Sequence, residues 1–210
     1  MSWQVSARQV ADLAEETLWS SQGEPARDYL LGRGLEMSTI QAAHLGYIPG
    51  GYREWRTVAG VSVPCGITIP WLTNGEETLW AVKVRRASGS PKYVQIAGGS
   101  QGGLYQADQL KGARAALFCE GEFDALLAQQ EGEPLVAAVT VGSASSRLNR
   151  RWLGELVSVP IILAAYDVDQ AGEKAAARMQ ALSGRVQVIQ VPWGKDLTEF
   201  HQQGGDLYSW

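Results

Sequence analysis

The stretch from Leu117 to Leu126, LFCEGEFDAL, indicates the fold of the second half of this chain. Its first residues continue an apolar run from Ala115 and predict a buried strand, whereas Asp124 lies in the first turn of a predicted helix. Between them, Glu120–Glu122 places carboxylates at the end of the strand. Carboxylates crowded there are costly unless something positive lies among them.

Two later apolar runs, residues 161–166 and 186–191, are also followed by acids. In an open α/β sheet the ligand site lies beyond the carboxyl ends of the strands. The acids in question are Glu120, Asp124, Asp167, Asp169 and Asp196. Residues two apart in an extended chain project to the same face, so Asp167 and Asp169 can reach one ion. Each acid could instead cap a helix, but spare acids at one edge would repel each other. The sequence therefore predicts a divalent-metal site.

From residue 115 onward, predicted strands alternate with predicted helices, which is typical of a parallel sheet with right-handed crossovers. The strands are predicted at 115–120, 135–140, 160–166 and 186–191, and the helices at 122–130, 146–156, 170–183 and 196–203. The preceding part mixes helices, predicted at 6–20, 26–31 and 38–45, with strands, predicted at 61–63, 67–71, 79–85 and 92–96. We therefore predict an α+β domain over residues 1–114 and an α/β domain over residues 115–210. Residues 97–103 are rich in glycine and predict a flexible loop.

The composition excludes several classes of protein. Hydrophobic residues make up 45% and charged residues 19% of the chain, which is typical of a globular protein and not of a disordered one. The two cysteines and two histidines are too few for a zinc site built only from Cys and His. Cys119, in an apolar strand, is predicted to be an inert buried thiol. No apolar run approaches the roughly 18 residues of a membrane span, and no signal peptide is visible, so we expect a cytoplasmic protein with no membrane partner.

The charge is unevenly distributed along the chain. Residues 1–116 contain 11 basic and 10 acidic residues, whereas residues 117–210 contain 7 basic and 12 acidic residues. A phosphate-binding surface is therefore expected in the first half. The predicted nucleotide-binding or DNA-binding residues are Lys83, Arg85, Arg86, Lys92 and Lys195, and Lys195 is also expected to pair with the acids. A solvated strand face is the alternative for the first four of these residues. For Gly142–Ser145, a strand-to-helix turn is favoured over a phosphate cradle.

These residues resemble the motifs of the Toprim fold, which DnaG-type primases, type IA and II topoisomerases and some nucleases share. The matching segments are Glu120–Leu126, the turn at Gly142, Tyr166–Gly172 and Gly194–Asp196. In the first half, Asp28–Leu35 continuing to Gly46-Tyr47, and the segments around Lys83–Arg85 and Pro91–Tyr93, resemble the DnaG-type catalytic core. Lys195–His201 is closest to the primase part of phage-type primase–helicases. Leu197-Thr198-Glu199 departs from the bacterial pattern, which has further acids there.

The resemblance implies a Toprim domain preceded by a small α+β primase-core subdomain, with the active cleft between them. It implies template-directed synthesis of short RNA primers on single-stranded DNA from nucleoside triphosphates. Two Mg²⁺ or Mn²⁺ ions would be held by Asp124, Asp167 and Asp169, with Glu120 as a ligand or general base. Lys83, Arg85 and Lys92 would hold triphosphate or template.

The resemblance also implies binding partners, and it leaves alternative functions open. Its members usually have an N-terminal zinc module and often a helicase part, neither of which is visible in this sequence, so a replicative helicase and a separate zinc-binding module are implied partners. Two other functions remain open. One is a Toprim-type nuclease that uses the same acids with water as the nucleophile. The other is a nucleic-acid-binding module of a larger replication protein. A topoisomerase is disfavoured because 210 residues leave no room for its gate domains.

Overall fold

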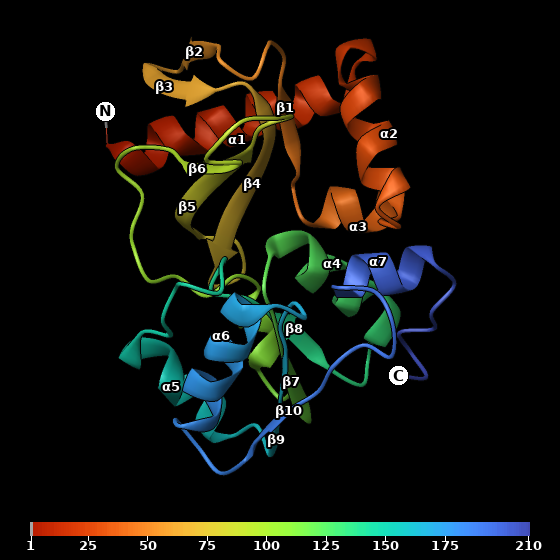
Figure 1. Ribbon diagram of the computed structural model, residues 1–210. Coiled ribbons are helices and arrows are strands. Elements are labelled where there is room, and N and C mark those ends of the chain that lie inside the picture. Colours follow the sequence, from red (N-terminus) through yellow and green to blue (C-terminus); the bar gives the residue numbers. More distant parts are fainter. Residues whose placement is uncertain (1) are drawn as a thin grey trace. The chain divides into compact units, whose positions relative to one another are not determined.

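A computed structural model describes residues 2–210, which form two compact units that divide between Gln101 and Gly102 (Figure 1). Residues 102–114 fold with the second unit for two reasons. Tyr105 forms an isolated antiparallel bridge with Thr140, and the indole of Trp152 donates a hydrogen bond of 2.8 Å to the Gly102 carbonyl. The functional division predicted at residue 114 stays a prediction.

The first unit combines helices with antiparallel strands. Its helices are α1 (Trp3–Trp19), η1 (Ser21–Gly23), α2 (Glu24–Gly32) and α3 (Met37–Ala42), and its strands are β1 (Gly46–Ile48), β2 (Trp55–Val58), β3 (Val61–Pro64), β4 (Gly66–Thr73), β5 (Thr78–Arg85) and β6 (Tyr93–Gln95). Four strands form one sheet in the order β1-β4-β5-β6, and β2 pairs with β3. Ala7, Val10 and Ala14 recur at helical spacing on α1, and they pack into one core with Val82 and Val84 of β5.

Two features of this unit differ from the prediction. β1 and β2 were not predicted, because β1 has only three residues and the residues of β2 are nearly all exposed, so neither shows a clear alternation of apolar and polar positions. Residues 97–100 also form hydrogen bonds with the rest of the unit, which the expectation of a flexible loop did not include. The Trp3 indole donates to the Ala97 carbonyl at 2.8 Å, and the Ser100 N–H donates to the Trp80 carbonyl at 2.9 Å.

The second unit is an α/β domain, as predicted. Its elements are η2 (Ala107–Leu110), β7 (Ala115–Cys119), α4 (Glu122–Gly132), β8 (Ala137–Val139), α5 (Arg150–Val157), β9 (Ile161–Ala165), α6 (Gln170–Gln180), β10 (Val186–Val188) and α7 (Leu197–Gln202). The strands form one parallel sheet in the order β10-β9-β7-β8. Every residue of β7 is buried, which explains why this strand is a continuous apolar run without alternation.

The helix after β8 begins later than predicted. Asn149 is the N-cap of α5, and its side chain accepts a hydrogen bond of 3.0 Å from the Arg151 N–H, so α5 starts at Arg150 rather than at residue 146. Gly142 lies in a turn with φ of 85°. The turn interpretation of this segment is therefore confirmed, and no helix N-terminus follows directly that could cradle a phosphate. None of the helices in residues 2–210 is long and apolar enough to span a membrane.

Candidate functional site

Three of the predicted acids lie near one another in the fold, at the carboxyl ends of two adjacent strands of the parallel sheet. β7 and β9 are adjacent, and Cys119 is in register with Ala165 at their carboxyl ends. Glu120 directly follows β7, Asp167 is the second residue after β9, and Asp124 lies in the first turn of α4. This is the edge at which ligands bind in open α/β sheets.

Asp169 is part of a tight turn that begins α6. Its Oδ1 accepts a hydrogen bond of 2.8 Å from the Gly172 N–H as the helix N-cap, and its own N–H donates to the Asp167 carbonyl at 2.8 Å. A Cβ at Gly172 would lie only 2.0 Å from that carbonyl oxygen. Gly172 is therefore needed to keep the turn closed around Asp167, a role that its position three residues after a capping aspartate could have indicated.

The third acidic segment is bonded to the same turn. The Lys195 carbonyl accepts a hydrogen bond of 2.8 Å from the N–H of Val168, which lies between Asp167 and Asp169. Asp196 is the N-cap of α7, where its Oδ1 accepts a hydrogen bond of 2.7 Å from the Glu199 N–H. Lys195 Nζ lies 3.9 Å from Asp196 Oδ2, so the pairing of this lysine with an acid is confirmed.

A threonine that the sequence analysis did not assign to the site supports Asp124. Thr198 Oγ1 on α7 donates a hydrogen bond of 2.7 Å to Asp124 Oδ1 on α4, and only 3% of Thr198 is exposed. This bond orients the Asp124 carboxylate and joins the two helices. The position of Thr198 in the first turn of a helix capped by Asp196 is the one sequence feature that could have identified it.

The carboxylates interact electrostatically. The pKa of Asp167 is raised from 3.8 to about 7, first by burial and then by repulsion from Glu120, Asp124, Asp196 and Asp169. Burial, followed by repulsion from Asp169, also raises the pKa of Glu120. Glu120 Oε2 is buried and has no hydrogen-bond partner in the described part of the chain. Negative charge is thus concentrated at this edge, and a bound cation would offset it.

The adjacent cysteine does not contribute a nucleophile. Cys119 is fully buried, and burial, with smaller effects from Asp124 and Asp167, raises the pKa of its thiol well above the usual value. The thiolate is therefore disfavoured, and the prediction of an inert thiol is confirmed.

The donor chemistry of this edge fits a hard divalent cation, because Mg²⁺ and Mn²⁺ prefer carboxylate oxygens. Within residues 2–210, no three side chains of His, Cys, Asp or Glu are already arranged around one point that could hold a metal ion. Asp169 and Asp196 each use one oxygen as a helix cap. The other oxygen of Asp169 is left for a ligand, whereas that of Asp196 lies 3.9 Å from Lys195 Nζ. The buried Glu120 Oε2 is a further oxygen donor.

The predicted basic residues of the first unit differ in their surroundings. Arg85 is 7% exposed and its guanidinium lies 4.1 Å from the centre of the Tyr29 ring. Arg86 is 9% exposed and its side chain donates to the carbonyls of Pro91 and Tyr52. These two arginines therefore pack within the unit.

The two lysines are more accessible than these arginines. Lys83 is half-buried, with Nζ 4.8 Å from the centre of the Trp71 ring. Lys92 is exposed. Binding of phosphate by these four residues stays a prediction.

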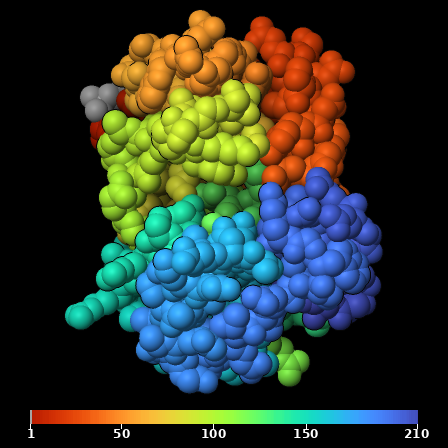
Figure 2. Space-filling model, viewed as in Figure 1, coloured from red at the N-terminus to blue at the C-terminus, as the bar shows by residue number. Residues whose placement is uncertain are grey.

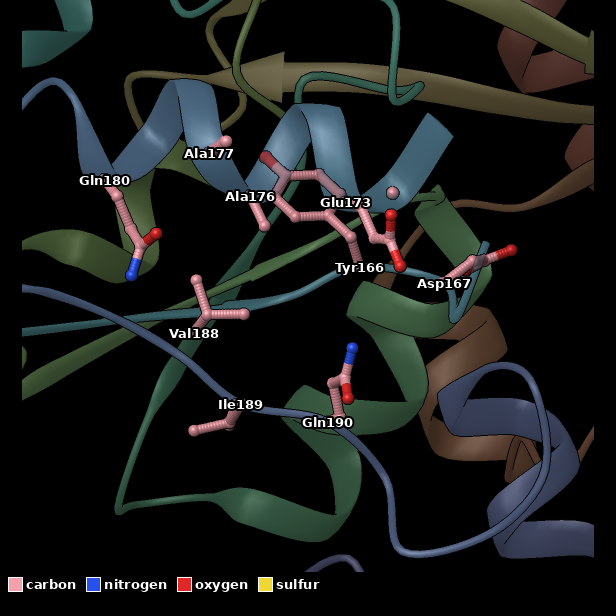
Figure 3. A pocket seen from close by; sticks show the side chains of 10 residues that line it. Tyr166, Asp167, Glu173, Ala176, Ala177, Gln180, Val188, Ile189 and Gln190 are labelled. Atoms are coloured by element: carbon pink, nitrogen blue, oxygen red, sulfur yellow. The ribbon is translucent and has the colours of Figure 1, made fainter. Parts of the chain in front are cut away.

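A pocket of about 190 Å³ adjoins the acidic edge between α6 and β10, and Asp167 is one of its lining residues. Figure 3 shows Glu173 of α6 and Gln190, just beyond β10, on opposite sides of it, with Val188 and Ile189 along its lower wall. Of the five acids, only Asp167 is among the residues that line this pocket.

Comparisons with known proteins agree with this fold. A family model described as Toprim-like matches residues 117–201, so the resemblance to Toprim proteins is confirmed for this segment. No curated protein matches the sequence.

Several solved structures are similar to the chain. The zinc-binding and RNA polymerase domains of the Aquifex aeolicus primase are 24% identical with a TM-score of 0.72, over 96% of this chain and 58% of that one. A DnaG primase catalytic domain bound to single-stranded DNA is 19% identical with a TM-score of 0.73, over 96% of this chain and 76% of that one. The primase fragment of the bacteriophage T7 primase-helicase protein is 21% identical with a TM-score of 0.62, over 85% of this chain and 70% of that one. The chain spans 58% of the Aquifex structure, and at these identities the likeness shows a shared fold.

Proposed function

We propose that this chain is the catalytic core of a DNA primase. The proposal rests on the Toprim-like match over residues 117–201 and on the similarity of the fold to DnaG-type primase catalytic cores. In this proposal it synthesises short RNA primers on single-stranded DNA by nucleotidyl transfer from nucleoside triphosphates. The observation that supports it most is the group of carboxylates at the ends of β7 and β9, where burial and then mutual repulsion raise the pKa of Asp167 to about 7. Such a site gains stability from bound cations.

The proposal assigns the metal site to five acids of the second unit. Asp124, Asp167, Asp169 and Asp196 hold a pair of Mg²⁺ or Mn²⁺ ions, and Glu120 is a further ligand or the general base. Such ions, held by these residues, would supply Lewis acidity toward the attacking 3′-hydroxyl and positive charge toward the phosphates. Glu120 suits a proton acceptor because its pKa is raised and its Oε2 is without a partner among the described residues.

Other residues of the chain position these acids or bind phosphate. Thr198 fixes one oxygen of Asp124, and Gly172 allows the turn that presents Asp167. Lys83, Lys92 and Lys195 bind phosphates of triphosphate or template. Arg85 and Arg86, which are 7% and 9% exposed, are proposed to support these lysines through their contacts within the first unit rather than as their main phosphate ligands.

The proposed partners are single-stranded DNA, nucleoside triphosphates, a replicative helicase and a zinc-binding module. Support for the DNA comes from the similar DnaG catalytic domain, which is bound to single-stranded DNA. Support for the helicase comes from the similar T7 fragment, which belongs to a primase-helicase protein.

One assay separates this proposal from its rivals. The chain is mixed with single-stranded DNA, labelled ribonucleotides and Mg²⁺, and the products are resolved on a gel, with Asp169→Asn as the control. New short oligomers that the control does not make support a primase. A shortened template would instead indicate a Toprim nuclease, and bound but unaltered DNA would indicate a binding module.

A further inference from the structure

Trp193 is an exposed indole close to the acidic edge. It lies three residues before Asp196, and 48% of it is exposed. Three residues span at most about 11 Å, so the Cα atoms of Trp193 and Asp196 lie within that distance. An indole left in water forgoes the stabilisation that burial of its large apolar surface would give. Its exposure leaves part of the ring surface accessible to a ligand.

The ring of Trp193 is backed by two further aromatic rings. Its centre lies 4.7 Å from that of Phe200, at an interplanar angle of 56°, and only 2% of Phe200 is exposed. Phe200 in turn lies 6.3 Å from the ring of Trp210, whose indole donates a hydrogen bond of 3.1 Å to the Gln190 carbonyl. Trp193 is thus the first of three aromatic rings in a row, and it packs against the buried ring of Phe200. Figure 2 shows the residues near the C-terminus, in dark blue, at the surface of the second unit.

The turn after Trp193 couples this ring to the acids and to a positive charge. Gly194 has φ of 78°, and a Cβ there would lie 3.2 Å from the Phe200 nitrogen, so the turn requires glycine. The next residue, Lys195, has a side chain that is 72% exposed. The hydrogen bond of 2.8 Å from the Val168 N–H to the Lys195 carbonyl fixes the turn against the Asp167–Asp169 segment.

We propose that Trp193 is a stacking platform for a base of single-stranded nucleic acid, with the adjacent phosphate paired to Lys195 and the reacting end of the strand at the carboxylates. An exposed aromatic ring beside a lysine is the combination that single-stranded nucleic acid needs, because every base has a face to stack and every nucleotide has a negative charge. The inference rests on the proposed function, since it names a contact of the same site with its nucleic acid.

The test measures binding rather than synthesis. Affinity for a labelled single-stranded DNA oligomer is measured by fluorescence anisotropy, with Mg²⁺ and without nucleotides. Trp193→Leu keeps apolar cover over Phe200 but has no aromatic face, so affinity falls roughly tenfold, whereas Trp193→Phe stays close to the wild type. Against an oligomer of the same length made of abasic sites, the wild type and Trp193→Leu bind equally.

Two controls separate stacking from other effects. Lys195→Ala lowers the salt dependence of binding, by about 0.7 in the slope of log K against log salt for one phosphate, whereas Trp193→Leu leaves the slope unchanged. Trp55 in β2 is 51% exposed and serves as the matched control, because Trp55→Leu also removes an exposed indole. We expect Trp55→Leu to leave the affinity for DNA unchanged.

Several results would overturn the inference. These are equal binding of the base-containing and abasic oligomers by the wild type, unchanged affinity of Trp193→Leu, and an equal loss in Trp55→Leu. The first needs no variant and so does not depend on how Trp193→Leu folds. Failure of the proposed function can be distinguished from failure of this inference. If the chain makes no primers but Trp193→Leu weakens DNA binding, only the primase function is refuted. If the chain makes primers and Trp193→Leu binds DNA normally, only the stacking role of Trp193 is refuted.

Discussion

Asp169 combines two roles at one side chain, because Oδ1 caps α6 while its other oxygen is proposed to bind metal. The two roles can be separated by substitution. Asp169→Asn keeps an oxygen for the cap but loses the negative charge, so we expect it to melt like the wild type and to lose Mg²⁺-dependent synthesis. Asp169→Ala also loses the cap and should be destabilised by about 1 kcal/mol. Thermal melts and the primer gel measure both. Wild-type turnover of Asp169→Asn at limiting Mg²⁺ would contradict the assignment.

Asp167 should make the metal-free protein less stable as the pH rises. Its pKa is about 7 in the folded chain and near 3.8 when unperturbed. The folded state therefore holds a proton that the unfolded state releases, and this contribution to stability is complete below pH 3.8 and lost as the pH rises through 7. In chelator, Asp167→Asn should flatten this dependence and melt higher than the wild type at neutral pH. Denaturant melts across the pH range are the measurement, and identical profiles would show that the pKa of Asp167 is not raised in the folded chain.

At the scale of elements, the bond from Thr198 to Asp124 joins α7 to α4 through two side chains. Thr198→Val keeps the shape of the side chain but removes the hydroxyl from a buried site, so the free energy of unfolding should fall by about 1–2 kcal/mol. Thr198→Ser retains the hydroxyl and is the control, and it should lose less. Chemical denaturation of the three proteins decides this. Equal stability of Thr198→Val and the wild type would mean that the bond does not join the helices.

Lys92 and Arg85 should respond differently to substitution. Lys92 is exposed, so Lys92→Ala should weaken DNA binding at low salt, and the difference should shrink as salt rises. Arg85 is 7% exposed and lies over Tyr29, so Arg85→Ala should instead lower the stability of the first unit by about 1–2 kcal/mol. Anisotropy titrations at several salt concentrations and melts distinguish the two effects. Normal stability of Arg85→Ala would return Arg85 to the phosphate-binding set.

The elements that could be predicted well from the sequence are those whose burial requires a recognisable pattern of apolar residues. β7 is buried throughout and appears as an unbroken apolar run, so both the strand and its parallel pairing could be inferred. β2 lies at the surface and leaves no comparable pattern. The loop at 97–100 was expected to be flexible because of its glycines, yet those glycines allow close packing against Trp3, 94 residues away in sequence. Contacts between distant segments of this kind are invisible to local patterns.

For the whole molecule, the convergence of acids at one edge of the parallel sheet could be predicted, but the bonds that position them could not. Strand ends followed by Asp or Glu indicated Glu120, Asp167 and Asp196, because parallel strands deliver their carboxyl ends to one edge. The bond between Thr198 and Asp124 spans 74 residues, and that between Val168 and Lys195 involves only backbone atoms. The place of Thr198 in a helix capped by Asp196 hints at the first bond but does not identify Asp124 as its partner, and no residue type marks the second bond.

Mg²⁺ should therefore stabilise the chain unevenly. All five proposed ligands lie in the second unit, so mass action by the bound ions should slow amide hydrogen exchange there, most at residues 120–124, 167–172 and 195–199, and should leave the core of the first unit unchanged. Hydrogen exchange with mass spectrometry in chelator and across a Mg²⁺ titration measures this. Asp167→Asn is the matched variant, and it should gain less protection from Mg²⁺ because it has lost one anionic ligand. If Asp167→Asn gains as much as the wild type, or if protection is confined to the first unit, the carboxylates do not share a metal site, and the proposed function loses the observation that supports it most.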